Sequence, residues 1–63
     1  MLLLDMREIG NKLLAIRKHM GMTQVEVAEA AGLSSRTYAD IERGTMNMCV
    51  ETILRIGLAF LHP

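Results

Sequence analysis

Residues 23–44 read TQVEVAEAAGLSSRTYADIERG, and this segment decides how the rest of the chain is organised. Thr23 and Glu26 form a capping-box pattern, in which the hydroxyl accepts from a free amide and the carboxylate reaches back to the cap. Apolar residues then follow at helical spacing, namely Val27, Ala28 and Ala31. The segment therefore begins with a short amphipathic helix.

A glycine and a serine separate this helix from a second one. Gly32 ends the first helix, because glycine accommodates the left-handed conformation of a helix exit. Leu33 is expected to be buried in the turn, and Ser34 to cap the second helix. Tyr38 and Ile41 give the second helix its inward side, and a further glycine closes it. Two short helices around a glycine-containing turn predict a helix-turn-helix.

This ordered set of residues resembles the Xre/Cro-like helix-turn-helix domains of phage repressors and bacterial regulators. The resemblance extends from about Ile9 to Phe60, and the matching residues are Thr23-Gln24, Glu26, Ala28, Gly32-Leu33-Ser34, Thr37, Ile41-Glu42 and Arg43-Gly44. It implies an all-α, lambda repressor-like DNA-binding domain of four helices, or a five-helix domain truncated after the fourth. Residues 1–63 are expected to form this single domain, with the motif at 23–44.

The composition favours packed helices and argues against several other classes of protein. The chain has 63 residues, of which 51% are hydrophobic and 3% aromatic, so its core must be aliphatic. The lone Cys49 cannot form an internal disulfide, and no Cys/His cluster has the spacing of a zinc site. We therefore expect no metal or cofactor, and a location in the reducing cytoplasm. Asp5 interrupts the opening leucines, which excludes a signal peptide or membrane span there.

The charge balance complicates the nucleic-acid interpretation. Seven basic and seven acidic residues cancel, whereas phosphate attraction favours a strongly basic domain. DNA binding would therefore depend on local geometry more than on the overall field. Catalysis is not expected, since no nucleophilic side chain has a histidine at a spacing that would indicate a nucleophile–base pair.

Before the motif, apolar residues recur at alternating spacings of four and three, at Leu2, Met6, Ile9, Leu13, Ile16 and Met20. This stripe predicts one long helix with a core-facing side. Its start is open: the helix begins near the N-terminus, or at Met6 with a cap from Asp5 and Glu8. Gly10 should weaken the helix by about 1 kcal/mol relative to alanine, and Gly21 should end it.

After the motif, a loop without basic residues leads to a last helix. Its expected inner side consists of Val50, Ile53, Leu54, Gly57 and Phe60. Four helices of this size leave apolar surface uncovered, and such surface usually marks an interface. We expect a second copy to cover Leu2, Leu3, Leu4, Leu58, Phe60 and Leu61. The alternative is that a tail missing from this chain covers them.

The resemblance also implies which residues contact the bases of DNA. In such domains the outward residues at the start of the second motif helix enter the major groove, here Ser35 and Arg36. Arginine suits this role because its planar fork matches guanine O6 and N7. Asp40 could accept from a cytosine amino group, but orienting Arg36 is the favoured role.

Contacts to the DNA backbone are implied for a second group of residues: Arg17, Thr23, Gln24, Arg43, Thr45 and Asn47. Gln24 lies in a first helical turn, where free amides also favour a phosphate. The resemblance further implies an ion pair between Arg17 and Glu42, which joins the first helix to the end of the second motif helix.

The function predicted from these features is a transcriptional regulator, a repressor that binds an inverted-repeat operator in double-stranded DNA as a homodimer. The rival is a protein-interaction module with the same fold, antitoxin-like or an adaptor, or the N-terminal fragment of a longer regulator. The neutral charge and the uncovered apolar ends favour the rival, whereas the intact motif favours DNA.

Overall fold

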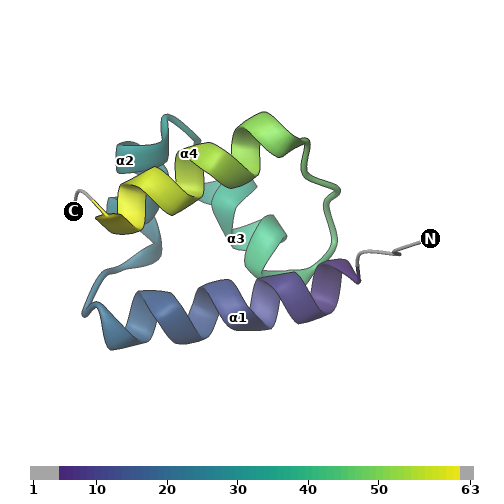
Figure 1. Ribbon diagram of the computed structural model, residues 1–63, viewed down its shortest axis with the longest axis horizontal. Helices are drawn as coiled ribbons and strands as arrows, with labels where there is room; N and C mark the ends of the chain where they lie inside the picture. Colours follow the sequence, from purple (N-terminus) through teal and green to yellow (C-terminus); the bar gives the residue numbers. More distant parts are fainter. Residues whose placement is uncertain (1–4, 62–63) are drawn as a thin grey trace.

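The computed structural model describes residues 5–61, which form four helices and no strand. The helices are α1 (Met6–His19), α2 (Gln24–Ala31), α3 (Ser35–Arg43) and α4 (Val50–Leu61). α2 packs on both α3 and α4, and α1 packs on α3. α1 and α4 run along the same side of the domain, with α2 and α3 behind them (Figure 1). The predicted all-α, four-helix architecture is confirmed.

The start of α1 follows the second of the two predicted alternatives. Asp5 adopts the extended backbone of an N-cap, and its carboxylate accepts from the amide of Arg7 at 2.9 Å. The predicted end is confirmed too, because Gly21 has a φ of 70° and lets the amide of Met22 return to the carbonyl of Arg17 at 3.0 Å. Leu2, the first residue of the apolar stripe, lies outside the described residues.

The predicted core side of α1 is only partly right. Leu13 is half-buried and packs against the core, but Ile16 and Met20 remain 43% and 41% exposed. The buried residue of α1 is Gly10. The predicted burial is wrong for Ile16 and Met20 because, within the described residues, the other helices leave the last turns of α1 partly uncovered.

The motif folds as its capping residues predict. Thr23 and Glu26 make both bonds of the capping box, at 3.1 and 2.9 Å. Gly32 adopts the left-handed conformation with a φ of 72°. Ser34 caps α3 by accepting from the amide of Thr37 at 3.1 Å. These helix caps therefore form as predicted, because each depends only on residues that are close in the sequence.

The core lies between α2, α3 and α4, and its residues come from all three helices. It consists of Val27, Ala28, Ala31, Tyr38, Ile41, Ile56, Ala59 and Phe60. Leu33, which was predicted to be buried in the turn, is half-buried and packs against this core. Small residues on α2 allow α3 and α4 to approach it closely, so the core is compact despite its single buried phenylalanine.

The inner side predicted for α4 is wrong for most of its residues. Val50 and Leu54 are 72% and 62% exposed, and Gly57 is exposed as well. The helix is turned so that Ile56, at 1%, and Ala59 face α2. Phe60 is buried with them, which excludes it from the expected partner surface. Since α4 has apolar residues on almost every side, its sequence alone could not choose between the faces.

Candidate nucleic-acid interface

The start of α3 presents a free outward surface. Ser34 holds the first turn in place, because its hydroxyl both accepts from the amide of Thr37 and donates to the Thr37 hydroxyl at 2.8 Å. Ser35 and Arg36 follow directly, and both are exposed. The two residues expected to contact bases are thus anchored at the backbone while their side chains remain accessible.

The opposite side of α3 is completely buried, and this burial sets the rotation of the helix. Tyr38 and Ile41 are 0% and 1% exposed. The Tyr38 hydroxyl is also buried, and no hydrogen-bond partner for it lies within residues 5–61. Burial, and then the neighbouring carboxylate of Glu42, raises the pKa of this hydroxyl above its usual range. Tyr38 is therefore a neutral core residue.

A cluster of Arg17, Gln24 and Glu42 joins α3 to α1 and α2. The Glu42 carboxylate accepts from Arg17 Nε at 2.7 Å and Nη2 at 3.3 Å, which is the ion pair implied by the sequence resemblance. It also accepts from Gln24 Nε2 at 3.1 Å. A fourth hydrogen bond of the cluster runs from Arg17 Nη1 to the carbonyl of Met22 at 3.0 Å. The cluster links three helices through one carboxylate.

The electrostatics of this cluster favour its charged form. The side chains of Arg17 and Glu42 are only 13% and 4% exposed. Burial by itself would raise the pKa of Glu42, but the hydrogen bonds from Arg17 and Gln24, together with the nearby Tyr38 hydroxyl, outweigh it and lower the pKa. The same carboxylate raises the pKa of Arg17, against the smaller effect of burial. Both groups are charged at neutral pH.

α1 reaches this cluster through a glycine that the sequence analysis treated only as a weak point. Gly10 lies so close to α3 that an added Cβ would come within 2.2 Å of the carbonyl oxygen of Glu42 and 2.7 Å of that of Ile41. Gly10 is therefore the crossing point of α1 and α3. A glycine inside an otherwise helical pattern was the available signal, since such a residue often marks a close packing contact.

Asp40 does not orient Arg36, so the role favoured for it was wrong. Its carboxylate instead forms an ion pair with Arg43, one turn further along α3. The Arg43 side chain is 66% exposed and Asp40 is half-buried. An aspartate has partners at both i−4 and i+3 on a helix, and the sequence could not show which arginine it would choose.

The first turn of α2 and the loop after α3 both make hydrogen bonds to α3. Thr23 is exposed but occupied by capping, and Gln24 is half-buried and bound to Glu42. The Thr45 hydroxyl donates to the carbonyl of Asp40 at 3.2 Å, and Asn47 is exposed. Several side chains expected to contact the DNA backbone thus also hold the domain together.

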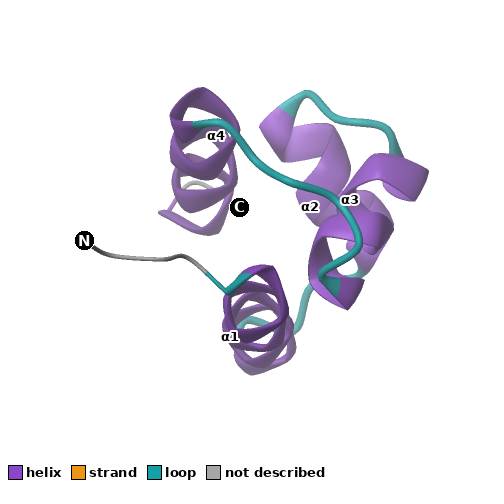
Figure 2. Ribbon diagram, turned by 90° about the vertical axis from the view of Figure 1, so that its right-hand side faces the viewer, coloured by secondary structure: helices purple, strands orange, loops and turns teal. Residues whose placement is uncertain are grey.

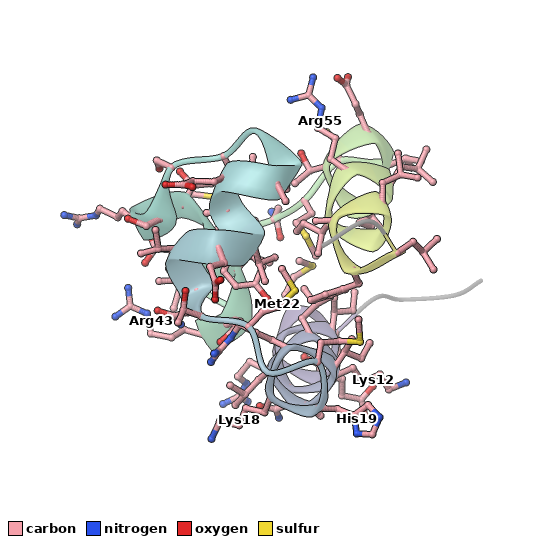
Figure 3. The ribbon with its side chains drawn as sticks, turned by 90° about the vertical axis from the view of Figure 1, so that its left-hand side faces the viewer. Lys12, Lys18, His19, Met22, Arg43 and Arg55 are labelled. Carbon is pink, nitrogen blue, oxygen red and sulfur yellow. The ribbon has the colours of Figure 1, made fainter. Side chains whose placement is uncertain are left out.

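Basic side chains are unevenly distributed in spite of the zero net charge. Lys18 and Arg43 extend on the side of α3, whereas Lys12 and His19 lie on the far side of α1 and Arg55 lies on α4 (Figure 3). Lys18, in the last turn of α1 directly after Arg17, was not among the residues expected to contact DNA. Basic side chains therefore lie on the α3 side, although one of them, Arg43, is paired with Asp40.

Two further properties concern only residues 5–61. Within this range no group of three or more His, Cys, Asp or Glu side chains is placed to hold a metal ion. In the same part of the chain, every helix is too short or too polar to cross a membrane.

The sequence of this chain is similar to those of transcriptional regulators. A family model described as helix-turn-helix matches residues 13–59. The immunity repressor protein of Bacillus phage phi105 is 44% identical over 45 residues, which cover 71% of this chain but only 31% of that repressor. An uncharacterized HTH-type transcriptional regulator of Sinorhizobium fredii is 33% identical over 57 residues, covering 89% of this chain and 74% of that protein. This chain thus spans about a third of the phage repressor.

Proposed function

This chain belongs to the Xre-like helix-turn-helix family of DNA-binding transcriptional regulators, and we propose that it is a repressor that binds an inverted-repeat operator as a homodimer. In such a complex the two copies of α3 enter successive major grooves about 34 Å apart. The immunity repressor among its relatives supports repression over activation. Because its proposed target is DNA, the same proposal assigns the chain to the cytoplasm.

The observation that carries this proposal is the contrast between the two sides of α3. Its inner side is held by Tyr38, Ile41 and the Glu42 cluster, while Ser35 and Arg36 are exposed in its first turn. A recognition helix needs this combination, since a rigid mounting fixes which base each side chain reaches. Arg36 is proposed to read guanine, with Ser35 beside it.

We assign a supporting role to the residues around α3. The first turn of α2 would direct free amides at a phosphate, assisted by the second Nε2 hydrogen of Gln24, since the first is donated to Glu42. Arg43 and Lys18 supply charge on the same side of the molecule. Thr23, Thr45 and Asn47 are proposed as weaker backbone contacts, and Arg17 as one limited by its burial with Glu42. Asp40 remains a proposed base contact, weakened by its pairing with Arg43.

Selection from a random pool of DNA duplexes at about 100 mM salt tests the proposal. We expect enrichment of a motif with two-fold symmetry. Arg36→Ala should reduce affinity by about 1–3 kcal/mol and relax the preference at one base position in each half-site. Arg55→Ala is the matched control, because Arg55 is an exposed arginine on α4, away from α3; its selected motif should be unchanged.

Two outcomes would contradict the proposal. One is the absence of any enriched motif, with binding that disappears on a modest increase in salt. The other is an equal loss of affinity in Arg36→Ala and Arg55→Ala, which would indicate a general charge effect without base reading.

A further inference from the structure

The outward side of α4 is the most apolar exposed surface of the described chain. Its members are Val50, Leu54, Leu58 and Leu61, which are 72%, 62%, 56% and 73% exposed. Gly57 lies among them, and, apart from its neighbours in α4, no atom of residues 5–61 is within 4 Å of the position that its Cβ would occupy. We call Val50, Leu54, Gly57, Leu58 and Leu61 the α4 stripe. It exposes the large apolar side chains of one helix in a continuous row, which is unusual for a monomer.

The α4 stripe lies opposite to the contacts that hold α4 in the domain. Ile56, Ala59 and Phe60 fill the inner side of α4, which packs on α2. α4 and α3 lie on different sides of the domain (Figure 2). A molecule that covers the α4 stripe would therefore leave the outward surface of α3 free.

The spacing of the α4 stripe is the same when read in either direction. Along its centre the residues are Val50, Leu54, Gly57 and Leu61, with steps of four, three and four. Such a 3-4 pattern is the seam along which two helices pack side by side. Because the steps are palindromic, an antiparallel second α4 brings Leu54 of one copy beside Gly57 of the other, and Val50 beside Leu61. All four positions are then matched by one two-fold axis.

The side-chain sizes select the antiparallel arrangement. A parallel pair would place Gly57 beside Gly57 and Leu54 beside Leu54, which leaves a gap in one layer and crowds the next. In the antiparallel pair each Leu54 enters the open space at Gly57 of the other copy, so large and small residues alternate as close packing requires. In a two-fold interface, each residue contacts its counterpart reciprocally in this way.

We propose that the α4 stripe is the dimer interface of this protein, formed by antiparallel pairing of α4 with α4 of a second copy. This inference rests on the homodimer proposed above and assigns its contact surface, with Val50, Leu54 and Gly57 added to the expected Leu58 and Leu61, and Phe60 removed. The expected Leu2, Leu3 and Leu4 lie outside the described residues and take no part in the argument.

The charges near the α4 stripe are compatible with self-association. Glu51 and Arg55 lie on one edge of α4 and neutralise each other, with Arg55 Nη2 at 2.6 Å from Glu51 Oε1. The whole chain also has a formal net charge of zero, so two copies do not repel each other at long range. A specific interface usually buries about 800 Å² per partner. Because the proposed contact uses one face of a 12-residue helix, we expect weak association, with a dissociation constant of about 10–100 µM.

Analytical ultracentrifugation of the purified chain without DNA tests the proposal. Between about 5 and 500 µM, the wild type should shift from monomer to dimer. Leu54→Glu should weaken the dimer by at least tenfold, because it brings a charge into the centre of the contact. Leu54 is 62% exposed in the monomer, so the circular dichroism and unfolding midpoint at low concentration should be retained. Arg55→Ala, on the same helix but off the α4 stripe, is the control and should dimerise normally.

Gly57→Leu tests the register of the two helices. In the monomer its side chain enters open space, and leucine favours a helix over glycine, so the unfolding midpoint at low concentration should rise. In the dimer the same side chain occupies the room that Leu54 of the other copy needs. We therefore expect at least tenfold weaker dimerisation from a variant whose monomer is more stable.

Each remaining outcome overturns the inference. A wild type that stays monomeric at 500 µM shows that something other than a second copy covers the α4 stripe. A dimer that survives Leu54→Glu uses another surface, and tighter dimerisation of Gly57→Leu excludes the proposed register. These results are independent of the DNA selection: a symmetric motif without a dimer in solution refutes the interface alone, and a dimer without an enriched motif refutes the proposed function alone.

Discussion

α3 and α4 differ in how their surroundings determine their orientation. α3 packs on both α1 and α2, and its buried side combines Tyr38 and Ile41 with the charged Glu42. α4 packs chiefly on α2, and its buried side contains only apolar residues. The polar outer side of α3 must stay in water and its one buried charge must find a partner. α4 has no such requirement, and apolar residues remain on both of its sides.

This difference shows that polar residues specify the orientation of a helix more sharply than apolar ones do. Turning α3 would bury Arg36 and expose Tyr38, with a large cost in desolvation. Turning α4 would exchange one set of apolar side chains for another. One side of α4 therefore packs on α2, while its other apolar side is left for the proposed contact with a second copy.

The largest expected effect tests the two sides of α4 against each other. Ile56→Ala should lower the free energy of unfolding by about 3 kcal/mol, because it opens a cavity where the side chain is 1% exposed. Leu54→Ala removes a comparable group from the outer side and should cost less than about 1 kcal/mol at low protein concentration. Urea unfolding measures both, and equal losses would mean that the α4 orientation is wrong.

The next effect concerns the close crossing of α1 and α3. Gly10→Ala should destabilise the protein by about 2 kcal/mol, since overpacking against the carbonyl of Glu42 outweighs the higher helix propensity of alanine. Gly57→Ala is the matched control, because it has the same change in propensity without a neighbour, and it should stabilise. Thermal unfolding of both variants at low concentration gives the comparison, and a stabilised Gly10→Ala would refute the crossing.

A smaller, pH-dependent effect is expected at the polar cluster of α3. Glu42→Gln should cost about 1.5 kcal/mol at pH 7, because Arg17 loses a charged, buried partner. The folded protein holds the pKa of Glu42 below its ordinary value, so this stability is present above about pH 4.3 and is lost as the pH falls through the lowered pKa. The difference between wild type and variant should therefore shrink on acidification.

Urea titrations at several values from neutral to acidic pH measure this difference directly. The other carboxylates are present in both the wild type and the variant, so their titration cancels in the difference between the two unfolding free energies. A difference that stays constant, or that grows towards acid, would show that Glu42 is not stabilised in its charged form.

The smallest effect is expected on the exposed side of α3. Arg43→Ala breaks the ion pair with Asp40, but the arginine side chain is 66% exposed, so unfolding should change by less than about 0.5 kcal/mol. Its loss should appear in DNA affinity instead, as a weakening that is similar for all sequences and a shallower dependence on salt. If Arg43→Ala lowered the stability as much as Glu42→Gln does, the exposed and buried sides of α3 would contribute equally, which contradicts this prediction.

The sequence by itself determined the elements of this protein whose causes are local. The capping box at Thr23, the left-handed Gly32 and the Ser34 cap each depend on atoms within a few residues. The inward Tyr38 and Ile41 were also predictable, because they are the large apolar residues of a helix that is otherwise polar or small. The helix-turn-helix and its exposed Arg36 follow from these signals.

Only the tertiary structure decided the contacts between elements that are distant in the chain. It bonded Gln24 to Glu42 and brought Gly10 against the backbone of α3. It also turned α4 so that Ile56 faces the core and Leu54 faces outwards. The physical reason is common to these cases: several partners or faces were equally acceptable locally, and the close packing of the helices against one another selected among them.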